Sequence, residues 1–310
     1  MKMANHQNPN VSVCIPVWNG GVYIALAIES VLQQSYSDFE IIISDNASTD
    51  DTVKIVEGYM QLHPQIRLQR NEENIGLVGN FNGCLKLAQG NYIKFLCVDD
   101  LLAKNCLEKM VRVLDEDKSI ALVVGGRSII DSFGCQISSQ RYSKSASVRN
   151  GYDVINRCYF GTNYIGEPSA VMFRKASLNR MFDKTLNHLM DLEMWFYLLE
   201  QGRMASLPDL LSSIRRHKNQ MTFQSVKTGA LIRDNLSLAT IYGNKSYIKN
   251  SQLNLFRRKI RIAYRVWQCR ESLGPDLKRR FLQDYSYPII YNIFIEPLGF
   301  AISILQRFRN

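Results

Sequence analysis

The segment YIKFLCVDD at residues 92–100 joins an apolar run directly to two adjacent aspartates. The near-continuous apolar run from Tyr92 to Val98 predicts a strand that is buried on both faces, as in a parallel sheet. Asp99 and Asp100 follow it, and two neighbouring carboxylates repel each other unless a cation or hydrogen-bond donors compensate. Hard divalent cations take oxygen ligands and often share them with phosphates. The segment therefore suggests a metal–diphosphate site at the end of a buried strand.

On both sides of this segment, short β-rich runs alternate with helical periods. The β-rich runs predict further strands at 11–16, 39–44, 66–69 and 120–125. Apolar residues spaced as on one helix face predict helices at 23–34, 52–62, 80–88 and 103–116. Such alternation predicts an α/β fold with a mostly parallel sheet and helices on both of its faces.

The pattern loosens after Gly125. Residues 127–150 are polar and rich in serine, and we expect a hairpin and a mobile loop there. The remaining periods predict helices at 151–160 and 189–201 and strands at 169–174 and 210–216. From about Leu231 the sequence becomes basic and amphipathic, which indicates a helical C-terminal appendage. We therefore expect two domains, 1–230 and 231–310.

The composition, with 310 residues of which 46% are hydrophobic and 21% charged, excludes disordered and collagen-like chains. The formal charge of +10 comes from the last third of the chain. Residues 1–200 carry 19 basic and 22 acidic side chains, whereas residues 201–310 carry 19 and 6. The seven cysteines include no CxxC pair, so we expect buried thiols in a reducing compartment. We expect neither a secretory signal nor a membrane-spanning helix, and thus a cytoplasmic protein.

Polar residues follow three of the predicted strands: PVWNG at 16–20, SDN at 44–46, and the two aspartates. In an open α/β sheet, ligands bind beyond the carboxyl ends of the strands, so these residues should converge on one crevice. Simpler roles stay open for some of them. Asp45 could serve only as the first residue of a turn, and Ser48 or Thr49 only as a helix cap.

Four blocks of sequence closely resemble, in order and spacing, the family 2 glycosyltransferases over roughly residues 10–220. The blocks are VSVCIPVWN at 11–19, SDNASTD at 44–50, NIG at 74–76 and AQGNYIKFLCVDD at 88–100. The resemblance implies a GT-A fold, which is a Rossmann-like α/β fold, and a nucleotide-diphosphate sugar as donor, with a UDP-sugar favoured.

The same resemblance implies a set of binding residues. Those assigned to the nucleotide sugar are Pro16, Val17, Asn19, Asp45, Asn74 and Asp99. Asp45 would contact the base or the ribose. The fuller form of the acidic motif has an aspartate where this chain has Cys97. We assign Asp100 to the metal, Mn²⁺ or Mg²⁺, and Asp99 to the ribose or sugar, an assignment that could be reversed.

The resemblance places the catalytic base at the start of a later helix, where LMDLEMW occupies 189–195. Met190 replaces the family's glutamate, and Asp191 is retained. An inverting transfer needs a base within ~3 Å of the acceptor hydroxyl, and Asp191 is our candidate. An acidic residue at a helix start is also favoured by the helix dipole alone. Glu193 is a nearby alternative, although it faces another side of the helix.

Two more residues are assigned through the resemblance. His217, in RRHKNQMT at 215–222, follows the last predicted strand and would contact the metal or the diphosphate. A histidine set among basic residues is poorly placed for a core. Glu167, in GEPS at 166–169, would lie on the acceptor side.

The C-terminal third interleaves basic and apolar residues. It contains FRRKIRIAYRVWQCR at 256–270, a basic cluster at 278–280 and an interrupted apolar stretch at 285–308. Basic residues beside aromatic ones suit an anionic membrane surface, where each Lys or Arg contributes roughly 1 kcal/mol. A helical subdomain with a solvated basic face is the main alternative. Nucleic acid is a rival partner that we do not expect.

Together these features predict an inverting, metal-dependent glycosyltransferase in cell-surface polysaccharide synthesis. It would act at the inner face of the membrane on a glycan or polyprenyl-diphosphate-linked acceptor. Two other classes stay open. A non-catalytic nucleotide-binding module would keep Asp45, Asp99 and Asp100 but would not need Asp191. A basic nucleic-acid-binding protein would use the C-terminal region, with the α/β domain as a scaffold.

Overall fold

The computed structural model describes residues 9–217 and 230–268. The chain forms two compact units. Unit 1 consists of Met1–Ile155, Asn163–Thr185 and Met190–His217, and unit 2 of Asn156–Thr162, Leu186–Leu189 and Lys218–Asn310. Unit 2 therefore includes two short segments from the middle of the chain in addition to the C-terminal region.

The elements alternate along the first half of the chain as the sequence pattern predicts. The strands are β1 Val11–Val17, β2 Phe39–Asp45, β3 Ile66–Arg70, β4 Tyr92–Phe95, β5 Leu101–Leu102, β6 Ile120–Ile130, β7 Gln136–Gln140, β8 Ser147–Arg149, β9 Val171–Arg174 and β10 Arg203–Arg215. The helices are α1 Ile24–Leu32, α2 Thr52–Leu62, α3 Gly76–Leu87, α4 Cys106–Glu116, α5 Gly151–Phe160, α6 Met190–Leu199, α8 Ala230–Tyr242 and α9 Gln252–Gln268, with short 3₁₀ turns η1 at Pro168–Ala170 and η2 at Lys175–Ser177.

Unit 1 is built on a mixed sheet with the strand order β3-β2-β1-β4-β9-β6-β10-β5, to which β7 and β8 add beside β6 and β10. Strands β3, β2, β1 and β4 are parallel, as expected. In the second half, β9 runs antiparallel to both β4 and β6, whereas β10 is parallel to β6. The predicted hairpin is formed by β6 and β7, since so short a connection permits only antiparallel pairing. The parallel arrangement thus describes the first half of the sheet.

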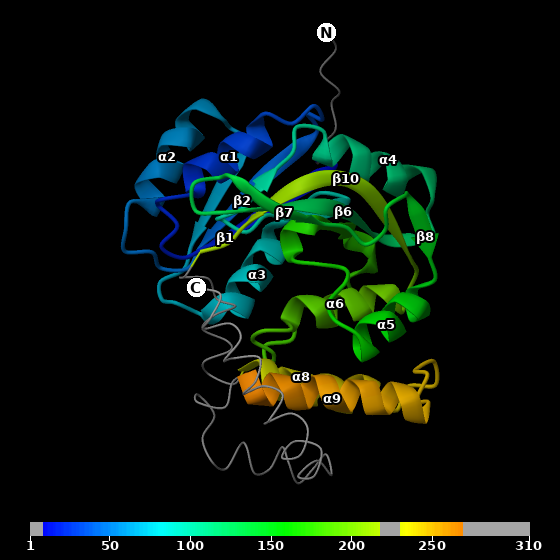
Figure 1. The fold of residues 1–310 in the computed structure, drawn as a ribbon. Helices are drawn as coiled ribbons and strands as arrows, with labels where there is room; N and C mark the ends of the chain where they lie inside the picture. Colours follow the sequence, from blue (N-terminus) through cyan, green and yellow to red (C-terminus); the bar gives the residue numbers. More distant parts are fainter. Residues whose placement is uncertain (1–8, 218–229, 269–310) are drawn as a thin grey trace. The chain divides into compact units, whose positions relative to one another are not determined.

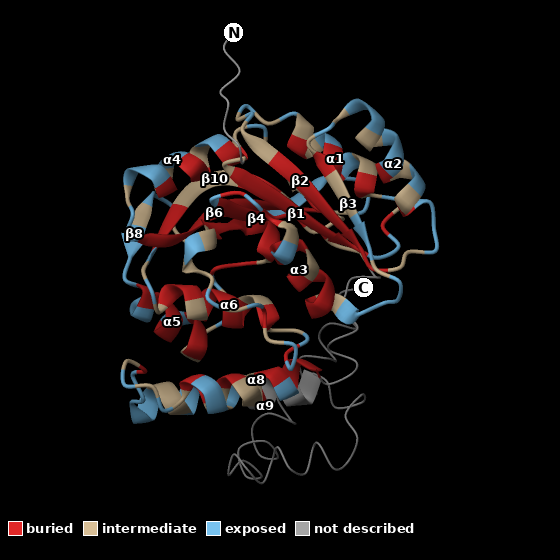
Figure 2. Ribbon diagram, turned by 180° about the vertical axis from the view of Figure 1, so that it is seen from behind, coloured by how far each residue is buried: buried red, intermediate tan, exposed pale blue. Residues whose placement is uncertain are grey.

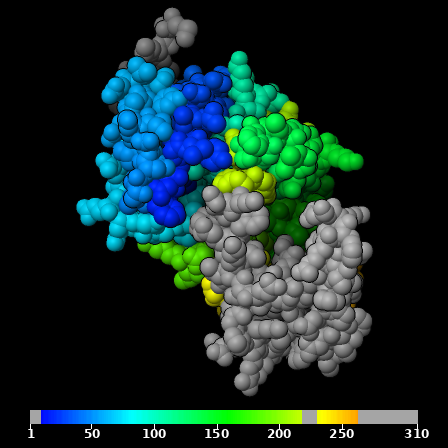
Figure 3. Space-filling view, turned by 60° about the vertical axis from the view of Figure 1, so that its left-hand side comes forward, coloured from blue at the N-terminus to red at the C-terminus, as the bar shows by residue number. Residues whose placement is uncertain are grey.

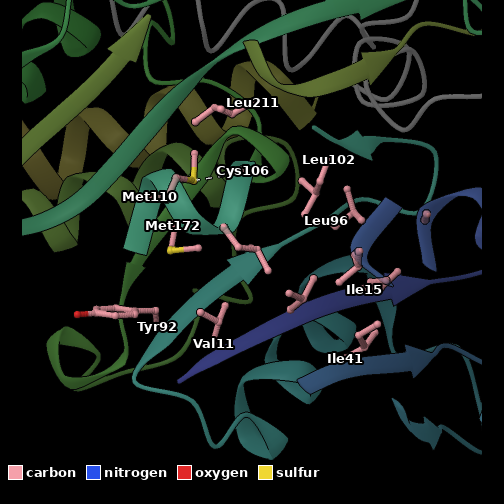
Figure 4. Packing of buried hydrophobic residues seen from close by; sticks show 14 of the residues in the cluster. Val11, Ile15, Ile41, Tyr92, Leu96, Leu102, Cys106, Met110, Met172 and Leu211 are labelled. Atoms are coloured by element: carbon pink, nitrogen blue, oxygen red, sulfur yellow. Dashed lines mark hydrogen bonds between the residues drawn. The ribbon is translucent and has the colours of Figure 1, made fainter. Parts of the chain in front are cut away.

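Helices α1, α2 and α4 cover one face of this sheet, and α3 and α6 cover the other (Figure 1). Strands β1 and β6 are buried along their whole length (Figure 2). For β1, this burial explains its near-continuous apolar sequence. Figure 4 shows part of the core on the α4 side, in which Val11, Ile15 and Ile41 of the parallel strands pack with Met110 and Leu211.

Three strands differ in length from the prediction. β4 ends at Phe95, not Val98, because the Cys97 amide donates to the Ser169 hydroxyl at 2.9 Å and leaves the sheet. β6 and β10 are longer than predicted, since their polar residues pair across a long parallel ladder despite register shifts. The loop expected before residue 150 contains β8, which adds to β10.

Unit 2 is held together by polar contacts that reach across the sequence. Asn156 donates to the Tyr247 carbonyl at 2.9 Å and accepts from the Lys249 amide at 2.7 Å. The Arg258 guanidinium lies 3.6 Å from the ring centroid of Tyr159, a cation–π contact. The basic cluster at 278–280 and the apolar stretch at 285–308 lie outside the described residues. Within the described ranges, none of the helices combines the length and apolarity needed to cross a membrane.

Candidate active site

The carboxyl ends of β1, β2 and β4 meet at one edge of the sheet. Val17 is in register with Asp45 across the β1–β2 ladder, and the Asn46 amide donates to the Val17 carbonyl at 2.9 Å. On the other side of β1, the Leu96 amide donates to the Cys14 carbonyl at 2.9 Å. Parallel pairing therefore brings the loops after all three strands together, as the sequence analysis expects.

The loop after β1 is fastened to the loop after β2. The Asn19 amide donates to the Ser48 hydroxyl, and the Asn19 side-chain oxygen accepts from the Thr49 amide, both at 2.8 Å. Asn19 has a φ of +51°, which asparagine tolerates better than most residues. Ser48 and Thr49 thus bind Asn19 and hold the two loops together. This is a different role from the helix cap that the sequence left open for them.

Asp45 is 1% exposed and uses its two oxygens differently. Oδ2 accepts from the Ser48 amide at 3.2 Å, so the turn role left open by the sequence is real. Oδ1 is buried and accepts a hydrogen bond from none of the described residues. A buried acceptor without a hydrogen-bond partner is costly, and a ligand that donates to it removes that cost.

The two adjacent aspartates have different environments. Asp100 is 3% exposed; its Oδ2 accepts from the Ser169 hydroxyl at 2.6 Å, and its Oδ1 from the Arg215 amide at 2.9 Å. Burial, and then the Asp99 charge, raise the pKa of the Asp100 carboxyl well above its usual value. Asp99 instead lies with His217, whose Nε2 is 3.0 Å from Asp99 Oδ2, and both side chains are 19% exposed.

His217 follows the end of β10, where a small cluster of rings and cations fixes it. Its ring centroid is 5.6 Å from that of Tyr23, and the Arg215 guanidinium lies 4.8 Å from the Tyr23 centroid. Arg215 also donates through Nε to the Asp99 carbonyl at 2.9 Å, so it ties β10 to the acidic loop. In the space-filling view, the yellow-green end of β10 reaches the surface beside the blue N-terminal elements (Figure 3).

Asp191 stands in the first turn of α6. Its carboxylate belongs to the same acidic neighbourhood as the two aspartates after β4: burial raises the pKa of the Cys97 thiol well above its usual value, and the charges of Asp100, Asp99 and Asp191 raise it further. The alternative base, Glu193, is 3% exposed and forms an ion pair with Arg180.

Glu167 lies between two arginines. Its carboxylate pairs with Arg216 Nη2 and with Arg127 Nε, each at 2.9 Å. The preceding Gly166 has a φ of +116°, and a Cβ there would lie 2.2 Å from Arg127 Nη1, so only glycine fits. The Gly166 carbonyl also accepts from Trp195 Nε1 at 3.2 Å, which connects this loop to the helix that carries Asp191.

A sequence model of one enzyme family, described as "Glycosyl transferase family 2", matches residues 12–182. The chain belongs to glycosyltransferase family 2. The predicted family is thereby confirmed, and with it the prediction that the chain is a glycosyltransferase.

Two relatives of this transferase are themselves named as glycosyltransferases. An uncharacterized glycosyltransferase of Rickettsia prowazekii is 30% identical over 223 residues, which cover 70% of this chain and 67% of the other. TuaG of Bacillus subtilis, named for teichuronic acid biosynthesis, is 30% identical over 194 residues, 63% of this chain and 73% of the other.

Two solved structures share the fold of the transferase. S. aureus TarS 1-349 in complex with UDP-GlcNAc superposes with a TM-score of 0.60 at 18% identity, over 91% of this chain and 90% of the other. The mannosyltransferase PcManGT from Pyrobaculum calidifontis, in complex with GDP-Man and Mn²⁺, gives 0.60 at 17% identity, over 96% and 87%. The expected GT-A fold is confirmed.

Several residues that hold the site of the transferase have no role assigned to them from the sequence. Asn46 donates to the Asn74 side-chain oxygen at 2.8 Å and accepts from the Ile75 amide at 2.9 Å. Asn80 donates to the carbonyls of Ser44 and Val17, at 2.9 and 3.2 Å. The sequence does contain a sign of the role of Asn80, because a polar residue on the apolar face of a predicted helix suggests a buried hydrogen bond.

Lys94 is a second kind of omission, a cation inside the predicted apolar strand. It is fully buried, and its ammonium donates to the carbonyls of Ser169 and Val171. Burial lowers the pKa of the Lys94 ammonium. Through Ser169, whose hydroxyl binds Asp100, Lys94 fixes the loop that supports the acidic pair.

Two side chains of the transferase have the spacing that a divalent cation requires. In the part of the chain that the structure describes, no three His, Cys, Asp or Glu side chains form a preassembled metal cluster. Asp99 Oδ2 and His217 Nε2 are 3.0 Å apart, close to the spacing of adjacent ligands around an octahedral ion with bonds of about 2.1 Å. Mg²⁺-type ions take their other ligands from substrate phosphates and water, so these two side chains fit such an ion.

Proposed function

We propose that this transferase moves a sugar from a nucleotide-diphosphate sugar to an acceptor hydroxyl in one inverting displacement assisted by Mn²⁺ or Mg²⁺. The observation that carries the proposal is the Asp99–His217 pair, with the Asp191 carboxylate in the same acidic neighbourhood. These groups match the two ends of the reaction. The Asp99–His217 pair would hold the cation that binds the departing diphosphate, and Asp191 would activate the incoming hydroxyl.

The donor half is assigned from the strand ends. Pro16 and Val17 end β1, and Asn19 lies in the loop that follows. The unpartnered Asp45 oxygen is a free acceptor for an N–H or O–H of the nucleoside. UDP is favoured, which the TarS complex with UDP-GlcNAc supports, although PcManGT was solved with a guanine nucleotide. Asn74 offers its amide N–H groups, since its oxygen already accepts from Asn46 and Gly76.

The acidic pair divides between ligand and scaffold. We propose that Asp99, with His217, holds the cation, which when bound neutralises charge on the leaving diphosphate. We propose that Asp100 instead stabilises the acidic loop, because both of its carboxylate oxygens already accept hydrogen bonds from Ser169 and Arg215. This reverses the assignment that the resemblance first suggested.

The acceptor half rests on Asp191. The carboxylate accepts the proton of the acceptor hydroxyl as that oxygen attacks the anomeric carbon on the face opposite the diphosphate. Glu167 positions Arg216 beside the site through their ion pair. The acceptor is a glycan or a polyprenyl-diphosphate-linked glycan of a cell-surface polysaccharide, which the similarity to TuaG supports.

Donor binding gives the direct test. Nucleotide sugars with uridine, guanosine and thymidine bases are screened by thermal unfolding, with and without Mn²⁺ or Mg²⁺. A donor at 100 times its Kd should add about 2.7 kcal/mol to the free energy of unfolding, and only with the metal. That corresponds to a Tm increase of several degrees, at about 2–4 °C per kcal/mol for a domain of this size.

The matched control is the same nucleotide sugar with Asp45→Asn, which keeps the size of the side chain but replaces an acceptor oxygen by a donor. This variant should lose the donor-dependent shift while keeping the unliganded Tm within a few degrees. A chain that no donor stabilises under any metal condition would contradict the proposed function.

A second proposal concerns where the enzyme works. On α9, the exposed side chains of Leu253, Phe256 and Ile260 fall on one helical face. Arg257 and Lys259 project on the two sides of that face. Apolar side chains flanked by cations suit the surface of an anionic membrane, so we propose peripheral attachment at the cytoplasmic face.

Cosedimentation with vesicles tests this attachment. The protein should bind phosphatidylglycerol-containing vesicles at low salt, bind pure phosphatidylcholine weakly, and dissociate as salt is raised. The double variant Phe256→Ser, Ile260→Ser should reduce binding severalfold, whereas Leu62→Ser, at another exposed apolar residue, should not. Failure to bind anionic vesicles at low salt would refute the attachment, and tighter binding to duplex DNA would favour the nucleic-acid alternative.

A further inference from the structure

A buried carboxylate in unit 2 receives three consecutive backbone amides. Asp234, on α8, is 1% exposed. Its Oδ2 accepts from the amides of Asn187, His188 and Leu189, at 2.9, 2.5 and 2.8 Å. The three backbone amides thus form a binding site for the Asp234 carboxylate. A buried charge is tolerated only when it is hydrogen-bonded in this way.

These three amides directly precede a helix start. α6 begins at Met190, so the amides of residues 187–189 belong to the three residues that lead into the helix. Leu189, the residue before the helix, has an apolar side chain and cannot act as an N-cap. Asp234, 45 residues further along the sequence than Leu189, supplies the carboxylate that accepts from these amides.

The segment that Asp234 holds leads straight to the proposed base. Asp191 is two residues beyond Leu189 and lies in the first turn of α6. Further along the same helix, Trp195 is anchored by its bond to the Gly166 carbonyl. Within that first turn, Asp191 Oδ1 accepts from the Leu192 amide at 2.7 Å. The segment that Asp234 holds is continuous in sequence with this turn.

We propose that Asp234 is a positioning residue for the proposed base, acting on transfer through the main chain of residues 187–189. The inference rests on the proposed function of Asp191. A displacement of about 1 Å at a reacting group can lower a rate on the order of 10²-fold, so loss of this anchor should be visible in kcat. Donor binding, which uses the loops after β1 and β2, should not change.

The test compares Asp234→Ala and Asp234→Asn with the control Asp183→Asn. Asp183 is a carboxylate in the preceding loop that accepts from Thr185 and makes no bond to residues 187–189 among the contacts described. We expect kcat to fall about 10–100-fold in Asp234→Ala, and less in Asp234→Asn, which keeps one acceptor oxygen. In both, the donor Kd should stay within about twofold, and the control should keep its kcat.

Two further measurements separate positioning from general stability. Amide hydrogen exchange should show lost protection at residues 187–189 in Asp234→Ala and partial protection in Asp234→Asn. Adding Asp234→Ala to Asp191→Asn should lower kcat by less than about twofold more, because residues that act as one unit are not additive.

Several results would overturn the inference. One is an unchanged kcat in Asp234→Asn or Asp234→Ala although residues 187–189 have lost protection. Another is a parallel fall of kcat and donor binding, which indicates loss of folded protein. A full additional loss in the double variant is the third. The proposed function fails differently: wild-type protein shows no transfer, or Asp191→Asn retains it.

Discussion

Replacing Asp191 with asparagine is expected to lower kcat by about 10²–10⁴-fold, the usual contribution of a general base. Asparagine keeps the size of the side chain but cannot accept the proton of the acceptor hydroxyl. Nucleotide-sugar affinity, measured by thermal shift or calorimetry, should stay within about twofold, because the donor loops do not involve α6. The fall should therefore be in kcat and not in the donor KM.

The matched control for this variant is Asp153→Asn. Asp153 is the acidic residue in the first turn of α5, so its replacement removes the same kind of helix-dipole contribution, about 0.3–1 kcal/mol. If Asp191 served only the dipole, the two variants would lose similar stability and retain similar turnover. Transfer that survives in Asp191→Asn with the donor still bound would remove the base assignment.

Replacing Asp99 with asparagine is expected to lower kcat/KM by about 10²–10³-fold and to abolish the metal-dependent part of donor stabilisation. The reason is the 3.0 Å pairing with His217 Nε2, which offers a cation two adjacent ligands. Loss of a charged ligand removes several kcal/mol of charge stabilisation. His217→Ala should show the same defect more weakly, since a neutral ligand is lost.

Asp100→Asn supplies the contrast. The two oxygens of Asp100 accept from Ser169 and Arg215. In the asparagine variant, the side-chain NH₂ would face one of these donors and could not accept from it, which should cost about 1–3 kcal/mol of folding stability. Asp99→Asn should leave the Tm nearly unchanged. If Asp100→Asn keeps its Tm and loses the metal dependence, while Asp99→Asn keeps that dependence, Asp100 is the ligand after all.

The sequence was sufficient for the first half of the fold. Strands near residues 11–17 and 39–45 are buried on both faces, so their apolar runs are nearly continuous and the helices between them have clear periods. The second half was harder to predict for a physical reason. β6 and β10 include polar residues that pair across a long ladder, and Ser128 and Ser212 are buried although serine gives no hydrophobic signal.

For the candidate site, the sequence pattern indicated the residues at the strand ends but not what holds them. Asp100 and Asp99 are indistinguishable in a motif, and only the bonds from Ser169 and Arg215 separate their roles. Asn80, Lys94 and Asp234 act through partners far away in the sequence. Their functions depend on which carbonyl or amide folding places beside them, and no local spacing records that.

The make-up of unit 2 has a consequence for the evolutionary modularity of this enzyme. Asn156 binds main chain at residues 247 and 249, and Asp234 binds main chain at 187–189. The last third of the chain therefore cannot be exchanged as an independent module by a single recombination event after His217. A hybrid made there would inherit three donors without their carboxylate. Divergence of the C-terminal region must therefore be accompanied by matching changes in the two short segments that it contacts, at 156–162 and 186–189.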